Sequence, residues 1–156
     1  MRHNRTKLIS LVVWGSFGAS SSSVGAEPAR WGMTCDAQKR CEMRIAQSED
    51  NREITRILIY RVGGKTLLEY LVPLKINLQR GITIKIADQI FATTSLYCDV
   101  SGCIGYALLD KKLLQAMKQG AQLQLAFSPH GDKNFYSFDY TLEGFSVAYE
   151  TFESVK

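Results

Sequence analysis

The sequence predicts an all-β fold, a single-domain antiparallel β-sandwich of barrel-like shape with one short α-helix near residues 110–119. Apolar and polar residues alternate along several runs, as is typical of strands that bury one face. Turn-forming residues interrupt these runs at intervals of about 8–12 residues, the spacing of sandwiches and barrels. A single stretch, KKLLQAMKQ, has the period of a helix instead.

The clearest strands are three runs in which every second residue is apolar, at 82–86, 123–127 and 136–142. Less regular patterns predict further strands. These lie at 31–35, 41–47, 54–62, 66–72, 89–94, 104–109 and 145–152. Because each pattern has one apolar side, the strands are expected to pack as layers around one core.

Glycine and proline mark several strand ends. Gly63 and Gly64 separate two runs rich in β-branched and aromatic residues, and glycine accepts the positive φ angles of a tight hairpin turn. Pro73 follows the run 66–72 and has no backbone donor for a strand ladder. The sequence therefore predicts a hairpin at 63–64 and a strand end at 73.

The predicted helix has a start signal, an apolar face and a stop signal. Asp110 is a favourable N-cap, and Gly120 is placed to end the helix. Leu113, Leu114 and Met117 share one side of it. Because so short a helix is marginal alone, we expect this side to cover an open end or edge of the sheets.

The first 26 residues have the three parts of a secretory signal peptide. Arginine and lysine residues precede the apolar segment Leu8–Ala19, and small residues lead to Ala26, the expected cleavage position. The apolar segment is shorter than the roughly 20 residues that a spanning helix needs. We therefore expect a periplasmic or secreted, outer-surface-associated protein, with no transmembrane segment in the mature chain.

The mature chain, residues 27–156, is predicted to form one domain. Three of the 19 Lys and Arg residues and none of the 15 Asp and Glu residues lie in the signal, which leaves a net charge of +1. The basic character of the whole chain is thus largely a property of its signal. We accordingly expect no nucleic-acid partner, and this net charge does not argue for an anionic membrane surface either.

All four cysteines lie in the exported part: Cys35, Cys41, Cys98 and Cys103. An even number of cysteines in an oxidising compartment predicts disulfides. A redox pair would favour C-x-x-C, and a zinc site would favour closer pairs and more histidine. We interpret the cysteines as structural disulfides and expect no metal and no cofactor.

Catalytic motifs are missing from the sequence. We find no nucleophile elbow, no metalloprotease motif and no phosphate-binding glycine loop. His130 is the mature chain's one histidine and lies in a Pro-His-Gly-Asp turn, which favours a solvated side chain over a catalytic base. We therefore name no catalytic or cofactor-binding residue and predict a protein that is not an enzyme.

Several features occur in an order that resembles the invasion-associated locus B family. They are Trp31-x-x-x-Cys35, Cys41, Val72-Pro73-Leu74, Cys98-x-x-x-Gly102-Cys103, the short helix ending at Gly120, and Gly144-Phe145-x-x-Ala148. The resemblance spans about residues 31–148. It implies an exported envelope protein of a Gram-negative bacterium, in a family named for host-cell invasion. The stretch KINLQRGITI departs from the family pattern, which usually has a glycine and another proline there.

Four cysteines allow three pairings. The chain-entropy estimate favours a long bridge such as Cys35–Cys98, at about 4 kcal/mol against about 2 kcal/mol for a local one. Local closure, however, is about 25 times more probable in an open chain. We expect Cys35–Cys41 and Cys98–Cys103, with the crossed pairings as the alternatives.

The sequence thus favours a non-enzymatic envelope factor that binds an unknown envelope or host protein and contributes to invasion or surface interaction. Two alternatives stay open. One is a periplasmic thiol-exchange enzyme, suggested by the Cys98 and Cys103 pair, and the other is a protein that binds a small apolar ligand between its sheets.

Overall fold

The computed structural model describes residues 30–155. The predicted signal peptide lies outside the described residues. In chain order the elements are β1 (Gly32–Cys35), β2 (Cys41–Glu49), β3 (Arg52–Val62), β4 (Lys65–Val72), β5 (Thr83–Ile86), β6 (Gln89–Ala92), β7 (Thr94–Asp99), β8 (Gly102–Leu108), α1 (Lys111–Gln119), β9 (Gln122–Phe127), β10 (Tyr136–Thr141) and α2 (Phe145–Ser154).

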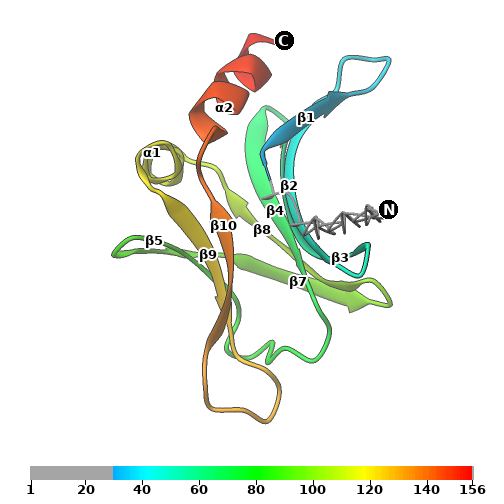
Figure 1. The fold of residues 1–156 in the computed structure, drawn as a ribbon, viewed down its shortest axis with the longest axis vertical. Coiled ribbons are helices and arrows are strands. Elements are labelled where there is room, and N and C mark those ends of the chain that lie inside the picture. The colour runs from blue at the N-terminus through cyan, green and yellow to red at the C-terminus, as the bar shows by residue number, and fades with distance from the viewer. Residues whose placement is uncertain (1–29, 156) are drawn as a thin grey trace, which may run out of the picture.

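The strands form two antiparallel sheets that pack against each other (Figure 1). The six-stranded sheet has the order β1-β2-β3-β4-β8-β7, and the four-stranded sheet has the order β10-β9-β5-β6. The predicted all-β sandwich is confirmed. The sheets do not close into a barrel, because no edge strand of one sheet is paired with an edge strand of the other among the described residues. The barrel-like part of the prediction is therefore wrong.

The core lies between the sheets and follows from the alternation. In β3 and β4 every second residue is buried, including Ile57, Ile59, Leu68 and Tyr70. Buried residues of the four-stranded sheet complete the same cluster: Ile84, Ile86, Leu123, Leu125 and Tyr140. Burying an aliphatic side chain of this size contributes about 1.5–3 kcal/mol, so these rows supply much of the driving force for packing.

The predicted hairpin after β3 is confirmed. Val62 pairs with Lys65, and Gly63 and Gly64 have φ angles of 55° and 73°. Positive φ at both central residues is the requirement of a type I′ turn, whose twist matches that of the flanking strands. Glycine satisfies it without steric cost.

Helix α1 covers the core from one end, as predicted. The Asp110 side chain accepts a hydrogen bond from the Leu113 amide at 2.8 Å, and Leu113 and Met117 are buried. Gly120 follows the helix, but with an extended φ of −77° rather than a left-handed one. A Cβ at this position would lie 2.5 Å from Ile86 Cγ2, so close packing on the sheet explains the glycine.

Residues 145–152, predicted to be a strand, form helix α2 instead, so the prediction of one short helix is incomplete. Phe145, Tyr149 and Phe152 are buried and lie four and three residues apart, on one side of a helix. Val147, which made the pattern resemble alternation, is 71% exposed. The Trp31 ring packs edge-on against Phe145, with ring centroids 5.0 Å apart, and thereby anchors the helix to the chain before β1.

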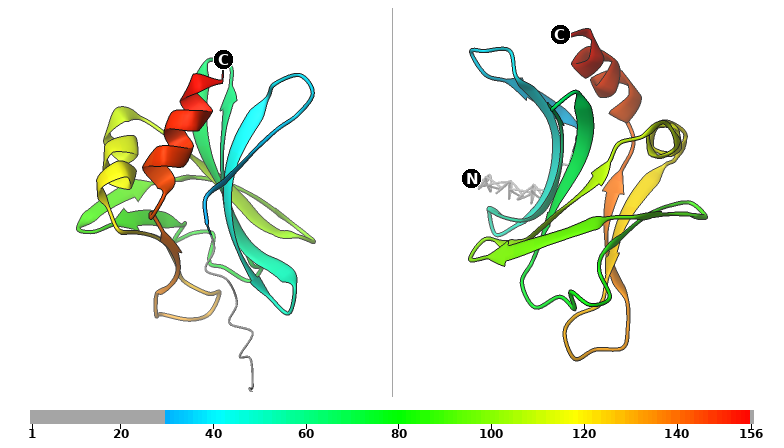
Figure 2. Two further views of the ribbon diagram at one scale, coloured as in Figure 1. Left: turned by 45° about the horizontal axis from the view of Figure 1, so that its top comes forward. Right: turned by 180° about the vertical axis from the view of Figure 1, so that it is seen from behind.

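Strand β7 was not predicted. It pairs with β8 and forms one edge of the six-stranded sheet. The register shifts between Ser95 and Tyr97, and this irregularity interrupts the alternation that reveals strands in a sequence. Both helices lie at one end of the molecule and the loop between β9 and β10 lies at the other (Figures 1 and 2).

Candidate binding surface

Each sheet has an outer face, defined here as the side turned away from the other sheet. In an antiparallel pair, residues directly opposite each other point to the same side. The register and the buried rows therefore identify which residues stand on each outer face. The two faces differ in composition.

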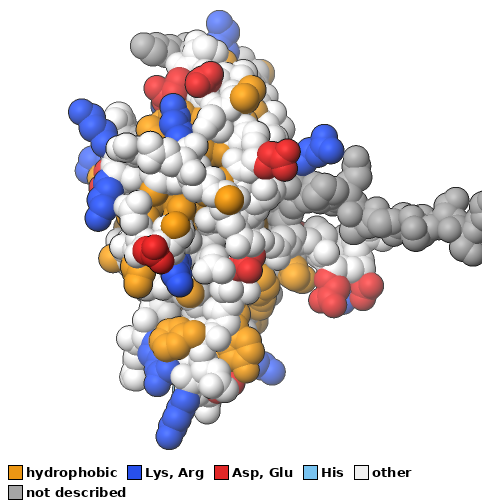
Figure 3. All heavy atoms as spheres, turned by 60° about the vertical axis from the view of Figure 1, so that its left-hand side comes forward, with side chains coloured by type: hydrophobic (Ala, Val, Ile, Leu, Met, Phe, Trp, Pro, Cys, Tyr) orange, Lys and Arg blue, Asp and Glu red, His pale blue; other side chains and the backbone are white. Residues whose placement is uncertain are grey.

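The four-stranded sheet has a mostly polar outer face. Its polar residues include Thr83, Lys85, Gln122, Gln124, Ser137, Asp139 and Thr141, and its one large apolar side chain among the described strand pairs is Ile90, opposite Lys85 on the edge strand β6. Figure 3 brings the left-hand side of Figure 1 forward and shows Lys, Arg, Asp and Glu side chains dispersed over it, with hydrophobic side chains between them. This is the ordinary composition of a solvated sheet face.

Over β3, β4, β8 and β7 the outer face of the six-stranded sheet is largely apolar and aromatic, whereas over β2 it carries Glu42 and Arg44. Three rows cross it: Leu58, Glu69 and Tyr106; Tyr60, Leu67 and Leu108; and Arg56, Leu71, Ile104 and Tyr97. Tyr97 is 62% exposed, Leu108 51% and Tyr106 43%. The members of these rows other than Leu71 are half-buried or exposed. A contiguous exposed patch of this kind is typical of an interaction site.

Glu69 lies at the centre of this apolar face and is held by two neighbours. The Tyr60 hydroxyl donates to Glu69 Oε2 at 3.1 Å, and Arg56 Nη2 lies 3.9 Å from Glu69 Oε1. Arg56 Nη1 also pairs with Glu53 at 3.0 Å, and Glu53 pairs in turn with Arg44. The outer face therefore combines aromatic side chains with a chain of alternating charges.

The surroundings of Tyr60 raise its pKa above the ordinary tyrosine value. Partial burial is the main cause, followed by the hydrogen bond to the Glu69 carboxylate. The nearby phenols of Tyr106 and Tyr97 add to the shift. At neutral pH the Tyr60 hydroxyl thus stays protonated and donates a hydrogen bond to the Glu69 carboxylate.

The structure joins the cysteines as two local pairs, Cys35–Cys41 and Cys98–Cys103, with S–S distances of 2.02 Å and 2.06 Å. Each pair joins directly opposite residues of an antiparallel ladder, with Cα atoms 4.0 Å apart. Cys98 is exposed and Cys103 is buried. Each bridge links the two strands of a hairpin next to its turn, a placement that favours a structural role.

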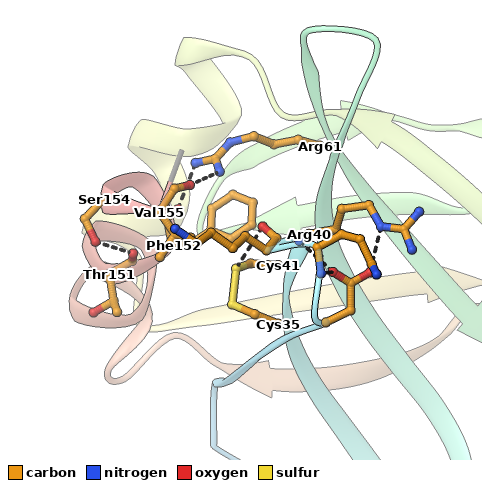
Figure 4. The surroundings of a disulfide bond; sticks show 11 residues. Cys35, Arg40, Cys41, Arg61, Thr151, Phe152, Ser154 and Val155 are labelled. Carbon is orange, nitrogen blue, oxygen red and sulfur yellow. Dashed lines mark hydrogen bonds and ion pairs between the residues drawn. A yellow bond between two sulfur atoms is a disulfide. The ribbon is translucent and has the colours of Figure 1, made fainter.

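The Cys35–Cys41 bridge lies beside the end of α2 (Figure 4). Arg61 reaches from β3 to this end and donates to the Phe152 and Val155 carbonyl oxygens, both at 2.9 Å. A surface pocket at this corner is lined by Lys39, Arg40, Cys41, Arg61, Glu153 and Val155.

The turn between β1 and β2, within the Cys35–Cys41 bridge, is ordered by one carboxylate. The Asp36 side chain accepts from the Gln38 and Arg40 amides at 3.0 Å and 2.8 Å and also pairs with the Arg40 side chain. The backbone hydrogen bond from Arg40 is the main cause that lowers the pKa of Asp36.

The structure gathers no catalytic constellation around the residues that the sequence singled out. His130 is exposed in the loop after β9, where its amide donates to the Lys75 carbonyl oxygen at 2.7 Å. Within residues 30–155, no cluster of three or more His, Cys, Asp and Glu side chains is placed to hold a metal ion. None of the described helices is long and apolar enough to cross a membrane.

Sequence reasoning missed the outer face. Its signal was present in residues 54–62, where Ile54, Leu58, Tyr60 and Val62 add apolar residues to the side opposite the buried row. A strand that is apolar on both sides is expected to be covered on both sides. The sequence alone did not show that one of these sides stays open.

Comparisons with known proteins agree on one family. The family model of the invasion associated locus B (IalB) protein matches residues 31–153. Two invasion protein B homologs of Brucella abortus, strains 2308 and 9-941, are each 27% identical over 132 residues, which is 80% of this chain and 76% of theirs. The crystal structure of invasion associated protein b from Bartonella henselae has the same fold, with a TM-score of 0.72, 22% identity, and coverage of 83% of this chain and 95% of that one. The chain therefore belongs to the invasion-associated locus B family.

Proposed function

We propose that this protein is an exported, non-enzymatic factor of the cell envelope or cell exterior that binds a partner protein through the outer face of its six-stranded sheet. The observation that carries the proposal is the contrast between the two outer faces. One is mostly polar, with Ile90 as a single exposed large apolar side chain at its edge, while the other exposes Tyr97, Tyr106 and Leu108 around a half-buried carboxylate. The names of the relatives connect the family with invasion, and we propose that this binding contributes to it.

The composition of the outer face favours a protein as the partner. Tyrosine and arginine are enriched at protein interfaces, where rigid aromatic side chains fill pockets at little entropic cost. Arg44, Glu53, Arg56 and Glu69 already neutralise one another, so little charge is left unpaired when water is removed. An anionic lipid surface would instead have to approach Glu53 and Glu69.

Site-specific photocrosslinking tests the partner surface. A photoreactive residue in place of Tyr106, in protein that cells export themselves, is expected to yield one discrete crosslinked product. The same residue in place of Lys85, on the polar outer face, is the matched control and should yield none. Mass spectrometry of the product then distinguishes a second protein from a second copy of this chain. A homodimer, or equal products from both positions, would overturn the proposal.

Substitution links the surface to function. Tyr106→Glu combined with Leu108→Glu should abolish crosslinking by a photoreactive residue that replaces Tyr97. The melting temperature should change little, because the side chains of residues 106 and 108 point away from the core. Lys85→Glu is the control. In an organism that invades host cells, a deletion strain that is given the double variant should enter host cells no better than the deletion strain itself. The same strain given the Lys85→Glu control should enter them as well as the wild type does.

Export has its own test. Cell fractionation followed by N-terminal sequencing should find the protein outside the cytoplasm, with a mature chain that starts at Glu27. An uncleaved chain in the cytoplasm would contradict the localisation without affecting the binding result. If the protein acts by thiol exchange, Cys98→Ala combined with Cys103→Ala should abolish host-cell uptake as the outer-face variant does, even where the variant stays folded. If the bridge is only structural, uptake should fall no further than the loss of folded protein explains.

A further inference from the structure

A second exposed surface lies at the end of the molecule opposite the helices. It consists of the loop 73–82 and the segment 128–136, named here the loop end. The two segments are held side by side because Ile76 forms a β-bridge with Pro129, and the Asn77 amide donates to the Ser128 carbonyl oxygen at 2.7 Å. The buried Ser128 hydroxyl also donates to the Asp132 carbonyl oxygen at 3.0 Å. The loop end is therefore a structured surface.

This surface exposes large apolar side chains. Phe135 is 65% exposed, and Leu74, Leu78 and Tyr136 are about half exposed. Leu78 stands in a turn closed by the Arg80 amide, which donates to the Asn77 carbonyl oxygen at 3.1 Å. The backbone hydrogen bonds of these segments therefore hold the apolar side chains in exposed positions.

The charges around these groups are mostly positive. Lys75, Arg80 and Lys133 are exposed, against one acid, Asp132. The Asp132 carboxylate is already occupied by the Tyr136 hydroxyl at 3.0 Å and the Asn134 amide at 2.9 Å. Figure 3 shows the mixture at its lower end, where hydrophobic side chains lie among Lys and Arg side chains. The loop end is more basic than the predicted mature chain as a whole, whose net charge is +1.

One cation is combined directly with an apolar group. The Arg80 guanidinium lies over the Phe135 ring, 5.6 Å from its centroid, and Nη1 donates to the Lys133 carbonyl oxygen at 3.2 Å. Arg80 thereby ties the tips of the two segments together. The arrangement places a positive charge directly beside the apolar tip.

We propose that the loop end docks peripherally on an anionic phospholipid surface. Phe135, Leu74 and Leu78 would enter the headgroup region, and Lys75, Arg80 and Lys133 would meet the lipid phosphates. Exposed aromatic and aliphatic groups surrounded by cations gain both apolar burial and attraction to anionic lipid. The outer face, with its paired charges of both signs, lacks this one-sided charge. The proposal is independent of the proposed protein partner, which uses a different surface.

Vesicle co-sedimentation of the full mature chain tests the proposal. Binding is expected to vesicles that contain phosphatidylglycerol and to be much weaker to vesicles of phosphatidylcholine alone. Lys75→Gln combined with Lys133→Gln should weaken binding roughly 25-fold, since each lysine near an anionic surface contributes a factor of about five. Added salt should likewise weaken the binding of the wild-type protein to anionic vesicles.

The apolar part needs separate variants. Leu78→Ser combined with Phe135→Ser should reduce binding to anionic vesicles strongly. Ile90→Ser is the control, because Ile90 is 66% exposed on β6, outside the loop end, and its loss should leave binding unchanged. Circular dichroism and melting curves establish that each variant is folded.

A fluorescent reporter completes the test. Trp31, the tryptophan that the described chain contains, is only 9% exposed, so the emission of a Phe135→Trp variant reports the loop end. A blue shift with phosphatidylglycerol vesicles is expected, and none with inorganic phosphate. Equal binding to both kinds of vesicle, unchanged binding by the lysine or apolar variants, or a response to inorganic phosphate without vesicle binding would each overturn the proposal.

Discussion

The Tyr140 hydroxyl lies 2.6 Å from Thr55 Oγ1 and joins the two sheets inside the core. Thr55 Oγ1 is also 2.6 Å from the Leu71 carbonyl oxygen, which can only accept, so Thr55 donates to Leu71 and Tyr140 donates to Thr55. Both side chains are fully buried. A chain of two hydrogen bonds therefore connects β10, β3 and β4 where no water competes.

Replacing Thr55 with valine should destabilise the protein by about 2 kcal/mol or more, because it leaves the buried Tyr140 hydroxyl without its acceptor. Tyr140→Phe should cost less, about 1 kcal/mol, since Thr55 keeps the Leu71 carbonyl oxygen as its partner. Urea unfolding of both variants and of the double variant measures the coupling. Additive losses would show that the two hydroxyls act independently.

Alkaline pH should destabilise the fold through Tyr140. Burial is the main cause that raises the pKa of Tyr140 from 10.0 to about 12. A group whose pKa is raised in the folded state stabilises the fold fully below its unfolded pKa. Its contribution is lost as pH rises through the folded pKa. The free energy of unfolding should therefore fall between about pH 10 and 12, and Tyr140→Phe should make this fall shallower. An identical slope in the variant would contradict the assignment to Tyr140.

The sequence predicted the strands wherever only one of their faces is apolar. Residues 123–127 have large apolar side chains only at every second position because their outer face is solvated, and the structure places β9 there. In α2, Phe145, Val147 and Tyr149 imitate alternation, and only the exposure of Val147 reveals the helical period. The outer face could not be predicted, because it depends on β8 lying between β4 and β7, a pairing of distant segments that local patterns do not encode.

Gly102 should tolerate no side chain. Its φ angle is 143°, and a Cβ there would lie 2.5 Å from the Val72 carbonyl oxygen. Gly102→Ala is expected to cost about 3 kcal/mol or more through backbone strain and overpacking. Gly81→Ala is the matched control, because Gly81 also has a positive φ, 67°, but nothing lies within 4 Å of its Cβ position. Thermal unfolding should show a much smaller loss for Gly81, of about 1 kcal/mol. Equal losses of stability in the two variants would mean that the positive φ angle, and not the contact with Val72, determines the cost.

Each local disulfide should contribute about 2 kcal/mol, since each closes a short loop of the chain. Replacing Cys98 and Cys103 together by alanine should lower the free energy of unfolding by about that amount. Hydrogen exchange should rise first in the β7–β8 hairpin, the edge that the bridge staples. Peptide mapping of the non-reduced wild type checks the pairing, and a peptide that links the Cys35 and Cys98 regions would contradict it.

Arg61 should hold the last turn of α2 in place. Its guanidinium donates to the Phe152 and Val155 carbonyl oxygens, pairs with Glu153 and lies 4.0 Å from the centroid of the Phe152 ring. The last turn of α2 contains no basic residue of its own, so Arg61 supplies the positive charge that a helix C-terminus favours.

Arg61→Gln is therefore expected to cost about 1–2 kcal/mol and to speed amide exchange in residues 149–155 before the sheets are affected. Arg61→Lys should rescue only part of the loss, because an ammonium group cannot form the same planar fork of donors. Arg52→Gln is the control, since Arg52 is exposed at the start of the same strand. Exchange that rises uniformly over the whole chain in Arg61→Gln would show that Arg61 supports global stability rather than this corner.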